Sequence, residues 1–188
     1  MAQLSLSLLG SFQATLDGKP ITGFKSNRVR ALLAYLAVEA DRQHRREVLA
    51  GLIWPDWPDR DALSNLRYSL SDLRRAIGDR EADPPFLLIT RDNLQFNPDS
   101  KYSLDVKTFI QVADTDKIDS LDIDLLEQTA ALYQGSFLEG FSLEDSAPFE
   151  EWTLLTRERL ARQASSLFHV LAESCEQQGE YDQAQSYA

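Results

Sequence analysis

Residues 59–78 read DRDALSNLRYSLSDLRRAIG. In this stretch Leu63, Leu66, Leu70, Leu73 and Ile77 recur at steps of 3, 4, 3 and 4, which is the spacing of one face of an α-helix. We expect the helix to begin near residues 59–61 and to end at the closing glycine, because glycine readily adopts the left-handed conformation that ends many helices. The stretch therefore predicts one continuous amphipathic helix whose leucine stripe packs on a core.

The opposite face of this helix is polar and partly basic. At about 100° per residue, a helix with the leucines inward directs six side chains outward or to the flanks: Ser64, Arg67, Tyr68, Ser71, Arg74 and Arg75. Arginine can bond guanine in a bidentate manner, serine can bond bases or phosphates, and tyrosine can pack on a sugar or a thymine methyl. The six are candidate base contacts in the major groove of DNA, although an ordinary solvated helix face would show the same pattern.

The segments that precede this helix predict a small sheet and two further helices. Alternating apolar residues at 4–8 and 12–16 are typical of strands, and Asp17-Gly18 is a strong signal for a tight hairpin turn. From Ser26 the apolar period becomes helical, which predicts a helix over about 27–39 capped by Ser26 or Asn27. A second, short helix carries the apolar residues of 48–53 and stops before Pro55.

A second hairpin is expected after the leucine-rich helix. Its strands are residues 86–90 and 94–96, and the turn between them is Arg91-Asp92-Asn93. The order of sheet, three helices and hairpin is that of an α+β winged helix with a small antiparallel sheet. We assign this winged-helix DNA-binding domain to residues 1–100.

The starts of the first two helices and the tip of the hairpin supply further candidate DNA contacts. Helix N-termini offer free N–H groups and a positive dipole end, and basic side chains beside them add charge. The phosphate candidates are Lys25, Asn27, Arg28, Arg45 and Arg46. The alternative interpretation of these residues is capping plus surface charge, and it is the favoured one for Lys25 or Arg45 taken singly. Arg91 is a candidate minor-groove contact in the wing, or a residue that merely solvates the turn.

Charge divides the chain into two unlike parts. Residues 1–100 hold 13 Lys and Arg against 13 Asp and Glu, whereas residues 101–188 hold 6 against 17, which gives net charges of about 0 and −11. A neutral first part can still carry a basic face, because the field at the contact surface matters more than the total charge. The split indicates two domains with different partners, DNA for the first and protein for the second.

The second part is predicted to be all-α. A long helix over about 148–178 carries Leu160, Ala164, Leu167, Leu171 and Cys175 along one face, where the cysteine is expected in the core. The spacing of the residues from 171 to 184 is that of a tetratricopeptide repeat whose second helix begins near residue 181. We therefore expect residues 101–188 to form a helical domain that stops within a repeat, in a fragment of a longer protein.

Other signals count against an enzyme or a membrane protein. No apolar stretch approaches the roughly 20 residues that span a bilayer, so we expect a cytoplasmic protein with no membrane partner. His44 and His169, the two histidines, lie in no catalytic or metal-binding motif, so we expect no enzyme activity, no cofactor and no metal. The acidic run 114–124 does not fit an EF-hand, since its sixth and twelfth positions are Asp119 and Leu125. Trp54 and Trp57 are expected to pack the turn before the leucine-rich helix.

The ordered set of motifs resembles the SARP-type transcriptional activators, whose winged helix also occurs in response-regulator output domains. The matching segments are LLGSF at 8–12, DGKPI at 17–21, NRVRALLAYL at 27–36, EVLAGLIW at 47–54, NLRYSLSDLRRAIGD at 65–79, ALYQGSFL at 131–138 and EEW at 150–152. The last two segments resemble the bacterial transcriptional activator domain that follows the winged helix in this family.

The resemblance implies an activator that binds double-stranded DNA at direct-repeat promoter sites, often as tandem protomers. It also implies that residues 101–188 contact a protein, either a neighbouring protomer or RNA polymerase. The chain departs from the family at the wing, which has Arg91-Asp92-Asn93-Leu94 in place of the frequent Gly-Tyr tip. Asp72 also lies near the exposed helix face and would repel phosphate unless it turned toward Arg75 or a cytosine amino group. The rival interpretation is a protein interaction module whose winged helix does not bind DNA.

Overall fold

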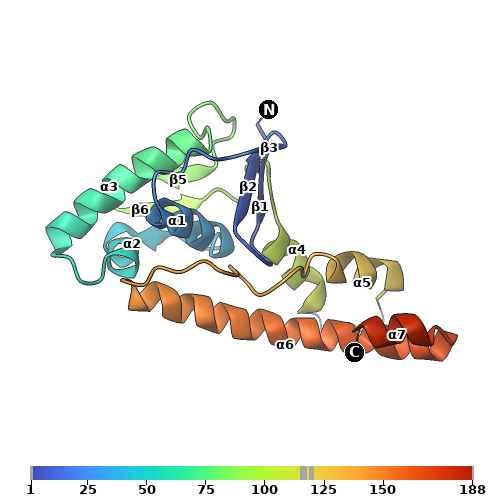
Figure 1. Cartoon of the computed structure of the whole chain (residues 1–188). Coiled ribbons are helices and arrows are strands. Elements are labelled where there is room, and N and C mark those ends of the chain that lie inside the picture. Colours follow the sequence, from blue (N-terminus) through green and yellow to red (C-terminus); the bar gives the residue numbers. More distant parts are fainter. Residues whose placement is uncertain (1, 115–117, 119–120, 188) are drawn as a thin grey trace.

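A computed structural model describes residues 2–114, 118 and 121–187, and it confirms an α+β winged helix followed by an all-α, tetratricopeptide-like part (Figure 1). The first part contains β1 (Leu4–Ser7), β2 (Gln13–Leu16), β3 (Lys19–Pro20), α1 (Asn27–Val38), β4 (His44–Arg45), α2 (Arg46–Ile53), α3 (Asp59–Ala76), β5 (Leu87–Ile89) and β6 (Asn93–Phe96). It is followed by β7 (Tyr102–Leu104), α4 (Asp105–Ala113), α5 (Ile123–Ala130), α6 (Ala147–Gln178) and α7 (Tyr181–Tyr187).

The N-terminal sheet has the order β3-β2-β1-β7. The predicted Asp17-Gly18 turn joins β2 to β3, and both of its residues have positive φ, 50° and 75°. β7 pairs in parallel with β1, so the sheet is mixed where the sequence suggested a wholly antiparallel one. Because β7 follows residue 100, the strand pairing links the two predicted domains, and the boundary at residue 100 stays a prediction.

The helix α3 is held by its leucine stripe, as its periodicity predicts. Leu66, Leu70, Leu73 and Ile77 are buried, and Leu63 is partly buried. The stripe packs against α1, whose residues 31–37 are all buried, and against α2. Aspartates in the first turn of α3 and arginines in its last turn interact favourably with the helix dipole. Gly78 follows the helix at a φ of 65°, in the left-handed region.

The wing is a three-stranded sheet of order β4-β6-β5. Its hairpin, β5 and β6, lies within the predicted residues 86–96. No pattern in the sequence indicated β4, a two-residue strand in which His44 pairs with Leu94. This strand ties the start of α2 to the wing.

The long helix α6 connects the two parts of the fold. Figure 1 shows it running beneath the winged helix, with α7 folded back along its C-terminal end. The predicted face from Leu160 to Cys175 is buried, which confirms the cysteine as a core residue. Ser146 caps the N-terminus of α6, and Gly179 ends the helix at a φ of 80°.

The winged helix and the helical part share one hydrophobic core. The Trp152 ring on α6 lies 5.0 Å from the Tyr35 ring on α1, and its indole N–H donates to the Glu39 carboxylate at 3.0 Å. The Asp105 carboxylate, at the start of α4, accepts from the N–H groups of Leu8 and Leu9 at 2.7 and 2.8 Å. The Trp152 contacts fix α6 against α1, and the Asp105 contacts fix the start of α4 against the end of β1.

The acidic run of the sequence is only partly covered by the described residues. Asp116 and Asp119 lie outside them, whereas Asp122 caps α5 through a bond from the Asp124 N–H. Within the described ranges no three metal-binding side chains cluster together. Nor does any helix of these ranges have the length and apolarity to cross a membrane.

Candidate nucleic-acid interface

The outward face of α3 presents an exposed aromatic ring between basic side chains. Tyr68 is 64% exposed, a high value for a large hydrophobic residue, and Arg67, Ser71 and Arg75 are exposed beside it. Ser64 is partly buried one turn earlier. Because the leucine stripe fixes the rotation of α3, these side chains point away from the core together.

Contacts among these side chains orient the two exposed arginines. The Arg67 guanidinium donates to the Ser64 hydroxyl at 3.4 Å and lies 5.6 Å from the centre of the Tyr68 ring. Arg75 pairs with Asp72 at 3.5 Å, so the aspartate turns toward that arginine. Both arginines are solvent-facing, and pairs of this kind are weak enough to exchange for a nucleic-acid partner.

Arg74 differs from the other five candidates on α3. Its Nε donates to the carboxylate of Asp79 at 2.7 Å, and that carboxylate is fully buried. The second oxygen of Asp79 accepts from the Leu87 N–H at 2.9 Å. The arginine thereby joins the end of α3 to the start of the wing, and we leave it out of the base-contacting set proposed below.

The candidates at the start of α1 are held in different ways. Lys25 is exposed, and the Asn27 side chain accepts from Arg30 at 3.2 Å. Arg28 forms an ion pair with Asp145, in the loop before α6, and its guanidinium lies 5.9 Å from the centre of the Trp54 ring. Arg28 is therefore already paired with an anion from the helical part of the chain.

A cleft of about 270 Å³ joins the start of α1 to the outward face of α3. Arg28 lies on one side, Tyr68 and Asn65 lie on the other, and Trp57 forms part of the wall. Trp54 is buried as expected for a turn-packing residue, but Trp57 is 48% exposed. No local pattern indicated that Asn65 or Trp57 would line a cleft with Arg28, since the cleft depends on the packing of α1 against α3.

The start of α2 lies beside the tip of the wing. The Arg46 guanidinium donates to the Thr90 carbonyl at 2.9 Å, and its backbone N–H donates to the Asp92 carbonyl at 3.0 Å. Arg45 is exposed, 4.0 Å from Glu47, and Arg91 is exposed in the turn. The structure thus brings Arg45 and Arg46, the phosphate candidates at the start of α2, onto one surface with the wing candidate Arg91.

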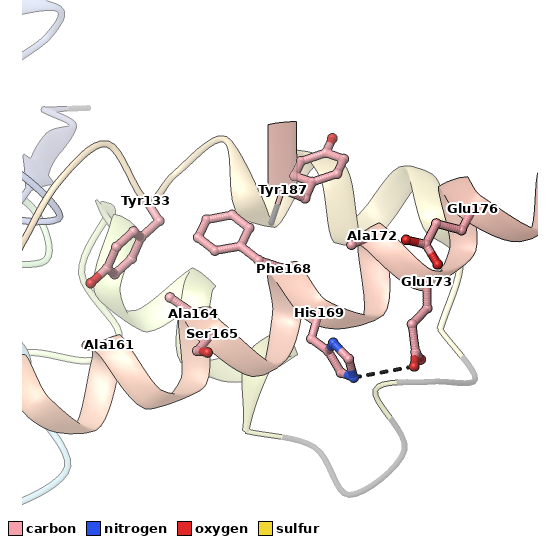
Figure 2. Close-up of a pocket in the computed structure, with 10 residues that line it drawn as sticks. All are labelled: Tyr133, Ala161, Ala164, Ser165, Phe168, His169, Ala172, Glu173, Glu176 and Tyr187. Atoms are coloured by element: carbon pink, nitrogen blue, oxygen red, sulfur yellow. Dashed lines mark ion pairs between the residues drawn. The ribbon is translucent and has the colours of Figure 1, made fainter. Parts of the chain in front are cut away.

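A groove of a different kind lies along α6 (Figure 2). It has a volume of about 600 Å³, and the rings of Tyr133, Phe168 and Tyr187 line it. His169 pairs there with Glu173 at 3.3 Å, on the exposed surface of α6. Ser165 and Glu176 also line the groove, beside His169 and Glu173.

The fold defines the class of protein, a winged helix joined to a tetratricopeptide-like helical part, and in this it resembles the SARP-type transcriptional regulators. No family model matches the chain. The chain is 31% identical over 86 residues to the transcriptional regulatory protein EmbR of Mycobacterium bovis and of Mycobacterium tuberculosis. This match covers 46% of the chain and 22% of the relatives' own length.

A solved structure agrees in fold over nearly the whole chain. It is that of Mycobacterium tuberculosis EmbR in complex with a low affinity phosphopeptide, with a TM-score of 0.70 and 20% sequence identity. The alignment covers 93% of this chain and 48% of the solved one, so the chain spans about half of that protein. Sequence and fold together confirm the resemblance to SARP-type regulators.

Proposed function

We propose that this chain is the DNA-binding part of a transcriptional regulator and that α3 enters the major groove of double-stranded DNA. The observation that carries the proposal is the outward face of α3, where exposed Arg67, Tyr68, Ser71 and Arg75 stand opposite a buried leucine stripe. A helix fits the major groove, and these side chains offer the donors and the apolar contact that base edges recognise.

Phosphate contacts would position the helix on the duplex. Lys25 and Asn27 lie at the start of α1, and Arg45 and Arg46 lie at the start of α2, beside Arg91 in the wing. Contacts of this kind orient a protein on the backbone without reading its sequence. The near-zero net charge of residues 1–100 does not oppose the proposal, because these basic groups gather at helix starts and at the wing tip.

The acidic helical part is proposed to contact protein rather than DNA. With a net charge of about −11, residues 101–188 would be repelled by the phosphate backbone. We propose that this part meets a neighbouring protomer or RNA polymerase when the regulator occupies direct-repeat promoter sites as an activator. The sequence relatives are transcriptional regulatory proteins, which supports a role in transcription, and the activity that we propose is binding rather than catalysis, in the cytoplasm.

The proposal is tested by selecting duplexes from a random pool with the 188-residue chain and measuring their affinity at several salt concentrations. Phosphate contacts predict a steep fall of affinity with salt. Arg67→Ala and Arg75→Ala should each cost about 1–3 kcal/mol on selected duplexes and much less on unselected ones, whereas Arg46→Ala should weaken all duplexes alike.

Arg162→Ala is the matched control, because Arg162 is an exposed arginine on α6, away from the proposed surface. It should bind like the wild-type chain. If no duplex is enriched, or if affinity is insensitive to salt, DNA binding is wrong and the interaction module is favoured. Equal losses for Arg67→Ala and Arg162→Ala would instead refute the assignment of the face.

A further inference from the structure

The loop before α6 places a carboxylate beside the start of α1, next to the surface that we propose to face DNA. Arg28 of α1 and Asp145 of this loop are separated by 117 residues in the chain, and they form an ion pair. The Asp145 side chain is 62% exposed and that of Arg28 is 27% exposed. The pair therefore lies at the surface, where solvent and other ions can reach it.

Arg28 lies between two clefts that share its side chain. One is the cleft toward Tyr68 on the outward face of α3. The other, of about 470 Å³, separates residues 26–28 from residues 142–145 of the loop. An anion that approached α3 along the DNA backbone would meet Arg28 from the first cleft, while Asp145 holds it from the second.

We propose that Asp145 acts as an autoinhibitory phosphate mimic, which occupies Arg28 until a phosphate of the DNA backbone displaces it. The inference rests on the proposed DNA-binding function. The carboxylate both neutralises a cation beside α3 and adds a negative charge that repels the duplex. The helical part would in this way lower the affinity of the winged helix for DNA.

The chemistry of the pair suits such an exchange. Exposed ion pairs are weak and are screened by salt, so a phosphate can compete for the guanidinium. The ion pair with Asp145 does not use every hydrogen-bond donor of Arg28, since the Nε of Arg28 is buried without a hydrogen-bond partner among the described residues. A phosphate group offers more acceptor oxygens to the planar donor set of an arginine than the single oxygen that Asp145 places on Arg28.

The loop is anchored independently of this ion pair. Leu143 is buried, and its N–H donates to the Glu150 carboxylate at 2.6 Å. Ser146 is fully buried, caps α6 and donates to the Leu52 carbonyl on α2. Removing the charge of Asp145 should therefore leave the loop and the fold in place, which circular dichroism and thermal unfolding would verify.

The test compares Asp145→Asn with wild type in the 188-residue chain, by fluorescence anisotropy on a labelled duplex of mixed sequence. A mixed sequence suffices because a phosphate contact does not depend on bases. Asp145→Asn should raise the affinity roughly two- to fivefold, the range that an exposed ion pair corresponds to. Its plot of log affinity against log salt should keep nearly the wild-type slope, because Arg28 meets a phosphate in both bound complexes.

Two further variants separate this contact from a general charge effect. Glu144→Gln removes the neighbouring carboxylate, which pairs with no cation in the described part of the chain, and should leave the affinity close to that of wild type. Arg28→Ala should abolish the gain produced by Asp145→Asn in the double variant. Both effects together support the proposal.

The proposal would be overturned if Asp145→Asn and Glu144→Gln changed the affinity for DNA equally, or if Asp145→Asn still raised the affinity in a chain that lacks Arg28. If the wild-type chain binds DNA in an Arg67-dependent manner in that case, the proposed function stands and only this inference fails. If neither the wild type nor any variant binds DNA, both fail together.

Discussion

Replacing Asp79 with alanine removes the buried carboxylate that joins α3 to the wing. One of its oxygens accepts from Arg74 and the other from the Leu87 N–H, and the side chain has no exposure to solvent. The variant leaves that N–H without its acceptor, at a cost of about 1–3 kcal/mol. It also breaks the ion pair, but Arg74 is 32% exposed and can turn to water, so the added loss is smaller than for a wholly buried pair.

We therefore expect Asp79→Ala to lower the free energy of unfolding by about 2–4 kcal/mol. Urea unfolding of the 188-residue chain, followed by circular dichroism, measures this change. The matched control is Asp72→Ala, which removes a carboxylate paired with Arg75 at 3.5 Å on the surface of the same helix. It should cost less than about 1 kcal/mol. Equal losses for the two variants would refute the structural role assigned to Asp79.

Three further results are expected. Burial raises the pKa of Asp105 above the ordinary value of 3.8. The stability that Asp105 contributes is therefore fully present below pH 3.8, and it is lost as the pH rises through the raised pKa of the folded chain. Asp105→Asn should flatten this fall in the free energy of unfolding, which urea unfolding at several pH values measures. Burial likewise raises the pKa of the Cys175 thiol, which should react with a thiol reagent only when the chain unfolds. Trp152→Phe should keep the ring contact with α1 but lose the bond to Glu39, at a cost of about 1 kcal/mol in thermal or urea unfolding.

The helices could be predicted because their signals are local. The leucine stripe of α3 and the glycines that end α3 and α6 lie within the segments that they shape. The strands that the sequence did not indicate are short and depend on distant partners. β4 needs β6, some 50 residues away, and β7 needs β1, at the other end of the winged helix.

The candidate site could be predicted only in part, for a similar reason. Helical spacing placed Arg67 and Arg75 on an exposed face, and they are exposed. It placed Arg74 on the flank of that face, but the chain turns after α3 and brings Asp79 against it. The pairing of Arg28 with Asp145 follows from the docking of α6 beneath α2, which no local pattern indicates.

The contact of α3 with DNA is tested most directly by a cleavage reagent attached to its outward face. Ser71→Cys, combined with Cys175→Ala, places a DNA-cleaving iron chelate at the exposed centre of that face. Ser166→Cys in the same background is the control, on an exposed position of α6. We predict cleavage within the selected duplex from position 71 and none from position 166. Cleavage from position 166 alone would contradict the account and place the duplex on the helical part of the chain.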